Sequence, residues 1–234
     1  MTMKFETRIS DIITRTHNVK SFRFPRPSSF TYKPGQFMYV QIKSGPKKIY
    51  KHFTISSSPT ETDFLEFTKK LTDHPFSIAL SKSKIEDWAT IDGPHGDFTI
   101  EGTPERVGML SGGIGITPLR SICRYCTDIK SETKITLIYS NHVEEDIVFR
   151  EELEDMQKES GNMKVVFTLN EASPAWKGYK GRIDAEMIRK EIPDYEKTLF
   201  FTCGPPAMVH AIEKLLKELK VPKAQIMKEN FPGY

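Results

Sequence analysis

Cysteine is scarce in this chain, with three among 234 residues, so the sequence offers no disulfide framework of the kind found in small secreted domains. No run of about 18 consecutive apolar residues occurs, so no transmembrane helix is predicted. The first residues, MTMKFE, lack the apolar core of a signal peptide. These absences predict a soluble, cytoplasmic protein.

An excess of charge of one sign is missing too. Lysine and arginine number 34 against 31 acidic residues, a formal net charge of +3. No basic tract with interleaved aromatic residues is present, so no nucleic-acid-binding surface is predicted. The six histidines show no metal-ligand spacing, and neither a G-x-S-x-G elbow nor a P-loop occurs. We therefore predict no metal site and no hydrolase or P-loop NTPase site.

The two halves of the chain differ in the period of their apolar residues. The first half reads as short strands separated by proline and glycine, with one helical patch, which favours an antiparallel barrel or sandwich. The second half alternates strands with helices, which favours a parallel sheet covered on both faces. We expect a β-barrel domain at 1–102 and an α/β domain at 103–234. The expected strands are 19–24, 36–42, 52–56, 65–68, 107–110, 134–139, 165–169 and 198–201, and the expected helices are 77–85, 119–128, 146–158, 185–191 and 207–219.

A glycine-rich loop connects the first strand of the second half to a helix. Gly112, Gly113 and Gly115 allow a tight turn and let a ligand lie close to the backbone. Thr117 is expected as the helix N-cap and Pro118 as the first helical residue. The N–H groups of such a helix start suit a pyrophosphate, although a turn that binds nothing would have the same glycines.

A second turn, CGPP at 203–206, lies between another strand and another helix. In an open parallel sheet, ligands bind beyond the carboxyl ends of the strands, near the point where the strand order reverses. We therefore expect the two turns to face one crevice.

Together these motifs resemble the ferredoxin–NADP reductase superfamily, in order and spacing along nearly the whole chain. The matching motifs are PGQF at 34–37, GPHGDF at 93–98, the glycine-rich loop, DIVFREEL at 146–153, CGPP at 203–206 with Met208, and ENF at 229–231. The resemblance implies an FAD-binding barrel, a nicotinamide-binding α/β domain and hydride transfer from NAD(P)H to the flavin.

The expected flavin motif departs from the superfamily's Arg-x-Tyr-Ser/Thr pattern, because Lys51, His52, Phe53 and Thr54 stand in its place. The resemblance implies that Lys51 contacts the FAD pyrophosphate as a point charge, in place of a bidentate guanidinium. It also implies that Phe53 packs on the isoalloxazine ring and that the Thr54 hydroxyl lies near flavin N5. Ser77 is expected as a helix N-cap that contacts phosphate. A degenerate barrel that binds no flavin is the alternative.

The resemblance places Thr54, Cys203 and Glu229 nearest the reacting atoms. A structural thiol at Cys203 and a solvated carboxylate at Glu229 are the alternatives. The residues implied to bind the nucleotide are Gly112, Gly113, Gly115, Thr117, Pro118, His142, Arg150, Arg182, Cys203, Gly204, Pro205 and Met208.

The nucleotide preference depends on three of these residues. His142 stands where NADPH users of the superfamily often carry arginine, while Arg150 and Arg182 lie in segments that can reach the 2′-phosphate in relatives. No acidic residue obviously occupies the ribose position that favours NADH. We expect a modest preference for NADPH.

The end of the chain carries two aromatic residues, Phe231 and Tyr234. In relatives a C-terminal aromatic ring covers the flavin face that nicotinamide approaches, so we expect one of the two there. An aromatic plug in a crevice away from the flavin is the alternative.

The cysteines bear on the route of the electrons. Cys123 and Cys126 spell C-x-x-C, but they lie inside an expected helix and no second pair completes a metal or iron–sulfur site. Electrons are therefore expected to leave the flavin directly for a separate carrier such as ferredoxin or flavodoxin. The alternatives are a reductase dedicated to an oxygenase or another enzyme, and a binding module without turnover. The basic loop of Lys43, Lys47 and Lys48 suits an acidic carrier, or is merely solvated.

Overall fold

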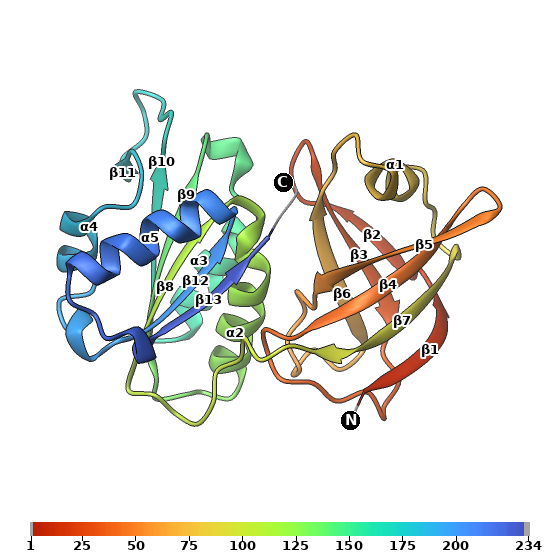
Figure 1. The fold of residues 1–234 in the computed structure, drawn as a ribbon, viewed down its shortest axis with the longest axis horizontal. Coiled ribbons are helices and arrows are strands. Elements are labelled where there is room, and N and C mark those ends of the chain that lie inside the picture. Colours follow the sequence, from red (N-terminus) through yellow and green to blue (C-terminus); the bar gives the residue numbers. More distant parts are fainter. Residues whose placement is uncertain (1, 232–234) are drawn as a thin grey trace.

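In the computed structural model, which describes residues 2–231, the first domain is a barrel of antiparallel strands in two sheets (Figure 1). One sheet has the order β1-β7-β4-β5 and the other β2-β3-β6. Its elements are β1 (Met3–Arg8), β2 (Asp11–Thr14), β3 (Val19–Pro25), β4 (Phe37–Ser44), β5 (Lys47–Thr54), β6 (Phe64–Lys70), α1 (Pro75–Ser81) and β7 (Trp88–His95).

The barrel has an apolar interior because apolar and polar residues alternate along its strands. In β4, Met38, Val40 and Ile42 are buried inside the barrel, whereas the side chains between them face outward. β6 is buried on both faces. Its Phe67 packs into the barrel core, and its Glu66 points toward the second domain, where it lies near an arginine of a helix.

The second domain is a six-stranded parallel sheet of order β11-β10-β9-β8-β12-β13 (Figure 1). Its strands are β8 (Arg106–Gly112), β9 (Lys134–Asn141), β10 (Met163–Leu169), β11 (Tyr179–Lys180), β12 (Leu199–Gly204) and β13 (Ile226–Asn230). Its helices are η1 (Gly113–Gly115), α2 (Ile116–Asp128), η2 (Glu144–Asp146), α3 (Arg150–Glu159), α4 (Ala185–Glu191), η3 (Tyr195–Lys197), α5 (Pro206–Glu218) and η4 (Lys223–Gln225). The helices α2 and α3 cover one face of the sheet, and α4 and α5 the other.

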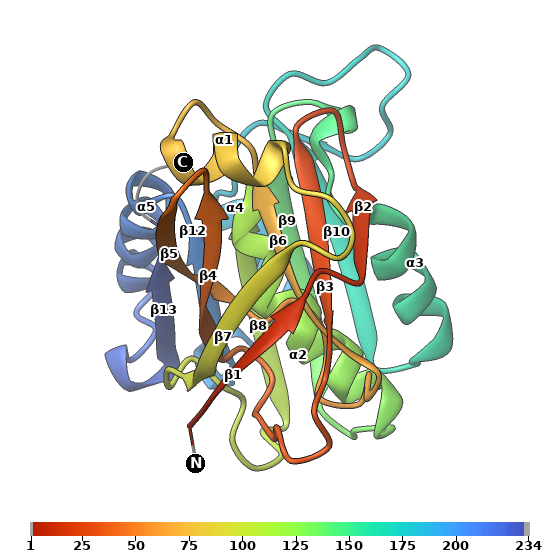
Figure 2. The same cartoon turned by 90° about the vertical axis from the view of Figure 1, so that its right-hand side faces the viewer.

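Helix α2 lies between the sheet and the barrel (Figures 1 and 2). Ile122 and Cys123 pack into the core under the sheet. On the barrel side, the hydroxyl of Ser121 donates to the carbonyl of Ser57 at 2.6 Å, and Arg120 donates to the carbonyl of Ser56 at 3.1 Å. One helix therefore belongs to the packing of both domains.

The expected fold class is confirmed, with differences in the elements. The expected helix 146–158 is wrong at its start, because Phe149 has a left-handed φ of 61° and α3 begins only at Arg150. The expected helix 77–85 begins at Pro75 and ends at Ser81. The strands β1, β2, β7, β11 and β13 were not expected. The boundary at 102 stays a prediction and falls between β7 and β8. Among residues 2–231, no helix has the length and apolar character to cross a membrane.

Candidate functional site

The parallel sheet has a crevice at its carboxyl edge, between the strands β8 and β12. The chain proceeds from β8 to β9 on one side and later adds β12 on the other, so the strand order reverses between β8 and β12. A cavity of about 660 Å³ opens there and is lined by Gly112 and Gly113 of the first turn and by Pro205 and Met208 of the second. The expectation that both turns face one crevice is therefore confirmed. Lys70 of the barrel also lines the cavity, which lies between the two domains.

Gly115 lets the two turns touch. A Cβ atom built on it would lie 2.3 Å from the carbonyl oxygen of Cys203 and 2.5 Å from the Cα of Gly204. No side chain caps the helix start at this point. A helix start without a side-chain cap, beside a cavity of this size, fits the pyrophosphate of a dinucleotide.

The expected capping of this helix by Thr117 is wrong. Because the turn η1 precedes α2, Gly115 occupies the N-cap position and the helix begins at Ile116. Thr117 lies inside the first turn, where its hydroxyl donates to the carbonyl of Ile114 at 3.3 Å. The expectation that Pro118 begins the helix is also wrong, because Pro118 is its third residue.

Cys203 and Glu229 meet across two neighbouring strands. They are register partners in β12 and β13, and the Cys203 Sγ lies 4.0 Å from the Glu229 Oε2. Burial raises the pKa of Glu229 to about 7. Burial, reinforced by the charge of Glu229, raises the pKa of the Cys203 thiol well above its usual value. The pair thus offers a thiol and a carboxyl group that holds a proton up to neutral pH.

Replacing Glu229 with glutamine should change how stability depends on pH. Between pH 4.5 and 7 the unfolded chain carries an ionised Glu229 while the folded chain keeps the proton, so this residue makes the free energy of unfolding fall as pH rises. The variant loses this slope, and relative to the wild type it should gain about 3 kcal/mol between pH 4 and pH 8. Urea unfolding at both pH values measures the difference. Parallel profiles for the two proteins would contradict the raised pKa.

The barrel presents a second set of polar groups at the edge of its larger sheet. Thr54 ends β5 and is 6% exposed, and within residues 2–231 its buried hydroxyl oxygen has no hydrogen-bond partner. Lys51 and Phe53 lie on the inner face of the same strand. On the facing strand β6, Lys69 is 1% exposed, with its ammonium 5.8 Å from the centre of the Phe53 ring. Burial, and then the charge of Lys51, lowers the pKa of Lys69 to about 8.

This arrangement fits a flavin dinucleotide. An unsatisfied buried hydroxyl calls for a polar ligand atom. The charge of Lys51 disfavours the charged form of Lys69, and an anion beside the two lysines would relieve this repulsion. Lys69 is a residue that sequence reasoning missed. The sequence signal for Lys69 is its position, because it alternates with Leu65 and Phe67 and therefore shares the inward face of β6.

The structure places Phe53 and Ser77 differently from what the sequence predicted. Phe53 stacks on Phe67 at 4.5 Å within the barrel core, so its packing on an isoalloxazine ring stays a prediction. The expected capping by Ser77 is wrong, because His74 holds the N-cap position and Pro75 begins α1. The Ser77 hydroxyl lies 3.2 Å from that of Thr72 instead. His52 lies on the outer face of β5 and is exposed.

The remaining nucleotide candidates divide between two cavities. His142 and Arg182 line the crevice between the turns. Arg150 lines a separate cavity of about 670 Å³ and is ion-paired with Glu144 and Glu154, so the structure does not bring it to the crevice.

Of the C-terminal aromatics, Phe231 is half-buried against the core of the second domain. Its N–H donates to the carbonyl of Gly204 at 3.0 Å. Tyr234 lies outside the described residues.

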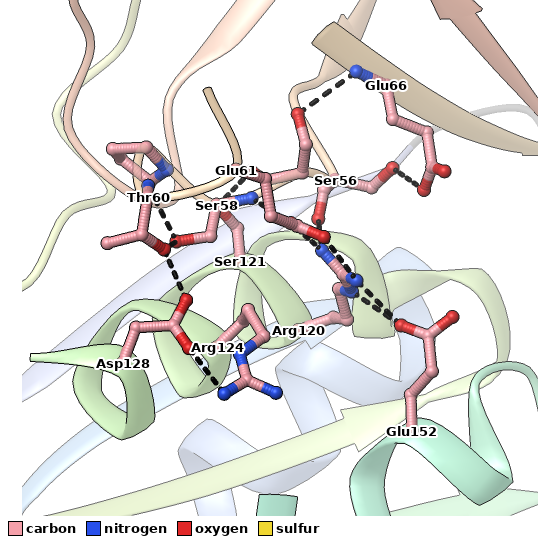
Figure 3. A network of polar contacts seen from close by, with 12 residues as sticks. Ser56, Ser58, Thr60, Glu61, Glu66, Arg120, Ser121, Arg124, Asp128 and Glu152 are labelled. Carbon is pink, nitrogen blue, oxygen red and sulfur yellow. Dashed lines mark hydrogen bonds and ion pairs between the residues drawn. The ribbon is translucent and has the colours of Figure 1, made fainter. Parts of the chain in front are cut away.

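A polar network joins the two domains beside this site (Figure 3). Arg120 of α2 is 4% exposed in its side chain and pairs with Glu61 of the barrel and, at 2.6 Å, with Glu152 of α3. Glu66 is fully buried and pairs with Arg15 at 3.0 Å. Although burial disfavours its charge, the guanidinium groups of Arg15 and Arg120 lower the pKa of Glu66. The network fixes the barrel against α2.

The C-x-x-C pair lies inside α2, as expected from the sequence. Cys123 and Cys126 are buried free thiols. Burial raises the pKa of both, that of Cys126 to about 11.

Comparison with known proteins covers both domains. Residues 6–100 match the oxidoreductase FAD-binding domain family, and residues 109–214 match the oxidoreductase NAD-binding domain family. The chain is 34% identical over 226 residues to NADH-cytochrome b5 reductase 1 from Aspergillus terreus, which covers 90% of this chain and 76% of that protein. It is 29% identical over 236 residues to the glycine betaine monooxygenase reductase subunit from Chromohalobacter salexigens, covering 97% of this chain and 64% of that subunit.

Solved structures share the whole two-domain arrangement. A ferredoxin NADP+ reductase from Neisseria gonorrhoeae, crystallised with bound FAD and NADP, has a TM-score of 0.83 at 26% identity and covers 97% of this chain and 98% of its own. The cytochrome b5 reductase domain of Ulva prolifera nitrate reductase has a TM-score of 0.85 at 23% identity, covering 97% of each chain.

Proposed function

The chain belongs to the ferredoxin–NADP reductase superfamily of FAD- and NAD-binding oxidoreductases, and from this premise we propose that it oxidises NAD(P)H and passes the electrons through FAD to a separate carrier protein. The observation that carries the proposal is the crevice at the strand switch point, because it opens between the domains and is lined by both nucleotide-binding turns. FAD, when bound, takes up a hydride and gives out its two electrons one at a time.

The protein's own part is to bind, orient and exclude water. The start of α2 and the glycine-rich loop hold the nucleotide pyrophosphate. The Thr54 hydroxyl, which is buried without a partner among residues 2–231, donates to or accepts from the flavin ring. Lys51 and Lys69 supply positive charge for the FAD phosphates, and Ser77 adds a hydroxyl nearby. Phe231 or Tyr234 covers the face that nicotinamide approaches.

Cys203 and Glu229 form the wall against which the nicotinamide reacts. Because both pKa values are raised, Cys203 keeps its proton at neutral pH and Glu229 keeps its proton below pH 7, so the wall adds less negative charge beside the dihydronicotinamide than an ordinary carboxylate would. The overall reaction converts one NAD(P)H and two oxidised one-electron carriers to NAD(P)+, two reduced carriers and one proton. Electrons and charge balance without a further reactant.

The flavin requirement gives the first test. Purified protein should retain FAD or take up about one FAD per chain, and saturating FAD at a hundred times its Kd should add about 2.7 kcal/mol to the free energy of unfolding. Anaerobic NADPH should then bleach the visible flavin absorbance. A protein that remains colourless through an FAD titration would rule out the proposal.

We also propose that NADPH is preferred modestly over NADH, on the support of Arg182, which lines the crevice. The preference is modest because His142, also in the crevice, stands where NADPH users often carry arginine. Replacing Arg182 with glutamine should lower kcat/KM for NADPH about tenfold, because a charged hydrogen bond to a 2′-phosphate is lost, and change that for NADH less than about twofold. Arg189→Gln, on an exposed position of α4, is the matched control. Equal losses with both nucleotides would place Arg182 away from the 2′-phosphate.

The carrier is proposed to be a one-electron protein such as ferredoxin or flavodoxin, in the cytoplasm. The alternative is a reductase component dedicated to an oxygenase. The likeness to the monooxygenase reductase subunit favours that alternative, although the chain covers 64% of that subunit. Measuring NADPH-dependent reduction of oxidised ferredoxin or flavodoxin, and of an oxidised oxygenase component, separates a general carrier reductase from a dedicated one.

A further inference from the structure

Tyr139 is a buried tyrosine whose hydroxyl reaches the glycine-rich loop. It belongs to β9, is fully buried, and packs in the core that α2 and α3 cover. Its hydroxyl donates to the carbonyl oxygen of Gly113 at 2.8 Å. A phenylalanine could fill the same apolar space without needing a hydrogen-bond partner. The hydroxyl therefore points to a part for this residue beyond packing.

The same hydroxyl contacts the segment between β9 and α3. Burial raises the pKa of Tyr139, and a backbone hydrogen bond with Val148 opposes that rise. Only a donor favours the ionised phenol, so the Val148 N–H donates to the phenol oxygen. Gly113 and Val148 both line the crevice. One buried hydroxyl thus joins two backbone segments at the border of the crevice.

The contact also fixes the direction of the peptide group between Gly113 and Ile114. In a planar trans peptide, the C=O and the following N–H point in opposite directions. The Gly113 carbonyl accepts from the Tyr139 hydroxyl, which is buried in the core, and from the N–H of Ile116. The N–H of Ile114 consequently points away from the core. Gly113 and Ile114 line the crevice, and the first N–H groups of a helix have no acceptor within it.

Gly113 leaves this peptide group free to turn. Its φ is +54°, in the left-handed region, and no atom lies within 4 Å of the position where a Cβ would stand. Glycine adopts positive and negative φ with similar ease, so the residue itself does not hold its carbonyl in one direction. A carbonyl oxygen turned toward the crevice would repel a phosphate. The loop therefore needs a hydrogen bond that holds this carbonyl toward the core.

We propose that Tyr139 is a positioning residue for the nucleotide, because its hydroxyl holds the Gly113 carbonyl toward the core and so turns the N–H of Ile114 toward the pyrophosphate. This inference rests on the proposed function and adds to it how the glycine-rich loop is kept in its binding form. The pyrophosphate is common to NADH and NADPH, so Tyr139 acts on both nucleotides alike, whereas Arg182 is proposed to distinguish them.

The test is Tyr139→Phe, which removes the hydroxyl and keeps the ring. Titration calorimetry on the FAD-loaded protein measures the affinity for NADP+ and for ADP, which has a pyrophosphate but no nicotinamide. Both affinities should fall about tenfold, as expected for the loss of one hydrogen bond. KM for NADPH and for NADH should rise by about the same factor, while kcat with ferricyanide changes less than about twofold.

The matched control is Tyr32→Phe. This variant removes another buried phenol, which donates to the carbonyl of Ser57 at 3.1 Å in the barrel. It should leave the affinities for ADP and NADP+ unchanged, because Tyr32 lies away from the glycine-rich loop. A similar loss in both variants would show a general effect of removing a buried hydroxyl and would overturn the positioning role.

A second variant tests the loop without changing Tyr139. Gly113→Ala makes the left-handed conformation costly and should also weaken ADP binding. Because both changes act on one peptide group, the double variant should lose less affinity than the product of the two single losses. Independent losses, or wild-type ADP affinity in Tyr139→Phe, would overturn the positioning role and leave the reductase proposal standing. A wild type that binds neither ADP nor NADP+ and does not oxidise NADPH would overturn the reductase proposal itself.

Discussion

Replacing Arg120 with alanine should lower the free energy of unfolding by about 3–5 kcal/mol, because removing one partner of a buried ion pair leaves its carboxylates without compensation. Arg120 is almost fully buried and pairs with Glu61 of the barrel and Glu152 of α3 (Figure 3). The fully buried Glu66 also loses a favourable charge. For a chain of this length the loss corresponds to a fall of about 10 °C in Tm. Urea and thermal unfolding of the purified variant measure both quantities.

The matched control lies one turn further along the same helix. Arg124 pairs with Asp128 and Glu159, but all three side chains are exposed to solvent by a fifth to a half. Arg124→Ala should therefore cost less than about 1 kcal/mol. If the two variants lost similar stability, the buried network would have no special part in holding the domains together.

Replacing Gly115 with alanine should strongly lower kcat/KM for NADPH. In Gly115→Ala the added atom would overlap the carbonyl oxygen of Cys203, which is backbone and cannot rotate away. The two turns must then separate, and a misplacement of about 1 Å at a reacting centre can cost about a hundredfold in rate. We expect kcat/KM for NADPH to fall by about that factor. FAD binding should remain, because the barrel is untouched.

Gly161→Ala is the control for this variant. Gly161 has no atom within 4 Å of the position where a Cβ would stand. Kinetics with NADPH and an FAD titration on both variants separate a defect of the crevice from a general one. Wild-type kinetics in Gly115→Ala would show that close contact of the turns is dispensable.

Local sequence signals predicted the parts of the fold that depend on local contacts. The strand β4 was predicted because the segment 36–42 is rich in β-forming residues between two proline–glycine turns, and the start of helix α2 because a glycine-rich turn precedes it. The first part of β5 was missed because its outward positions hold Lys48 and Tyr50 beside a Gly-Pro turn, which reads as a loop. β13 was missed because it is a short edge strand with mostly half-exposed residues.

The parts of the site that consist of contiguous sequence motifs were predicted. Both turns of the crevice come from contiguous motifs, so their meeting followed from the rule for parallel sheets. Arg120 and Lys69 could not be predicted, because a charged residue is expected outside and only its tertiary partners reverse that preference. Arg120 is buried because Glu61 arrives from the other domain. Thr117 was wrongly predicted as the N-cap because the turn η1 moves the N-cap two residues earlier, to Gly115, and no local sequence pattern indicates that turn.

The burial of the three cysteines protects their thiols from oxidants in the solvent. Oxidation of cysteine proceeds through the thiolate, and Cys123, Cys126 and Cys203 are buried with raised pKa values, so the thiolate is scarce at neutral pH. Peroxide or a stray disulfide that meets the surface finds no cysteine thiolate there. The burial of the three cysteines thus keeps their thiols protonated, and we expect the activity not to depend on an added reducing agent.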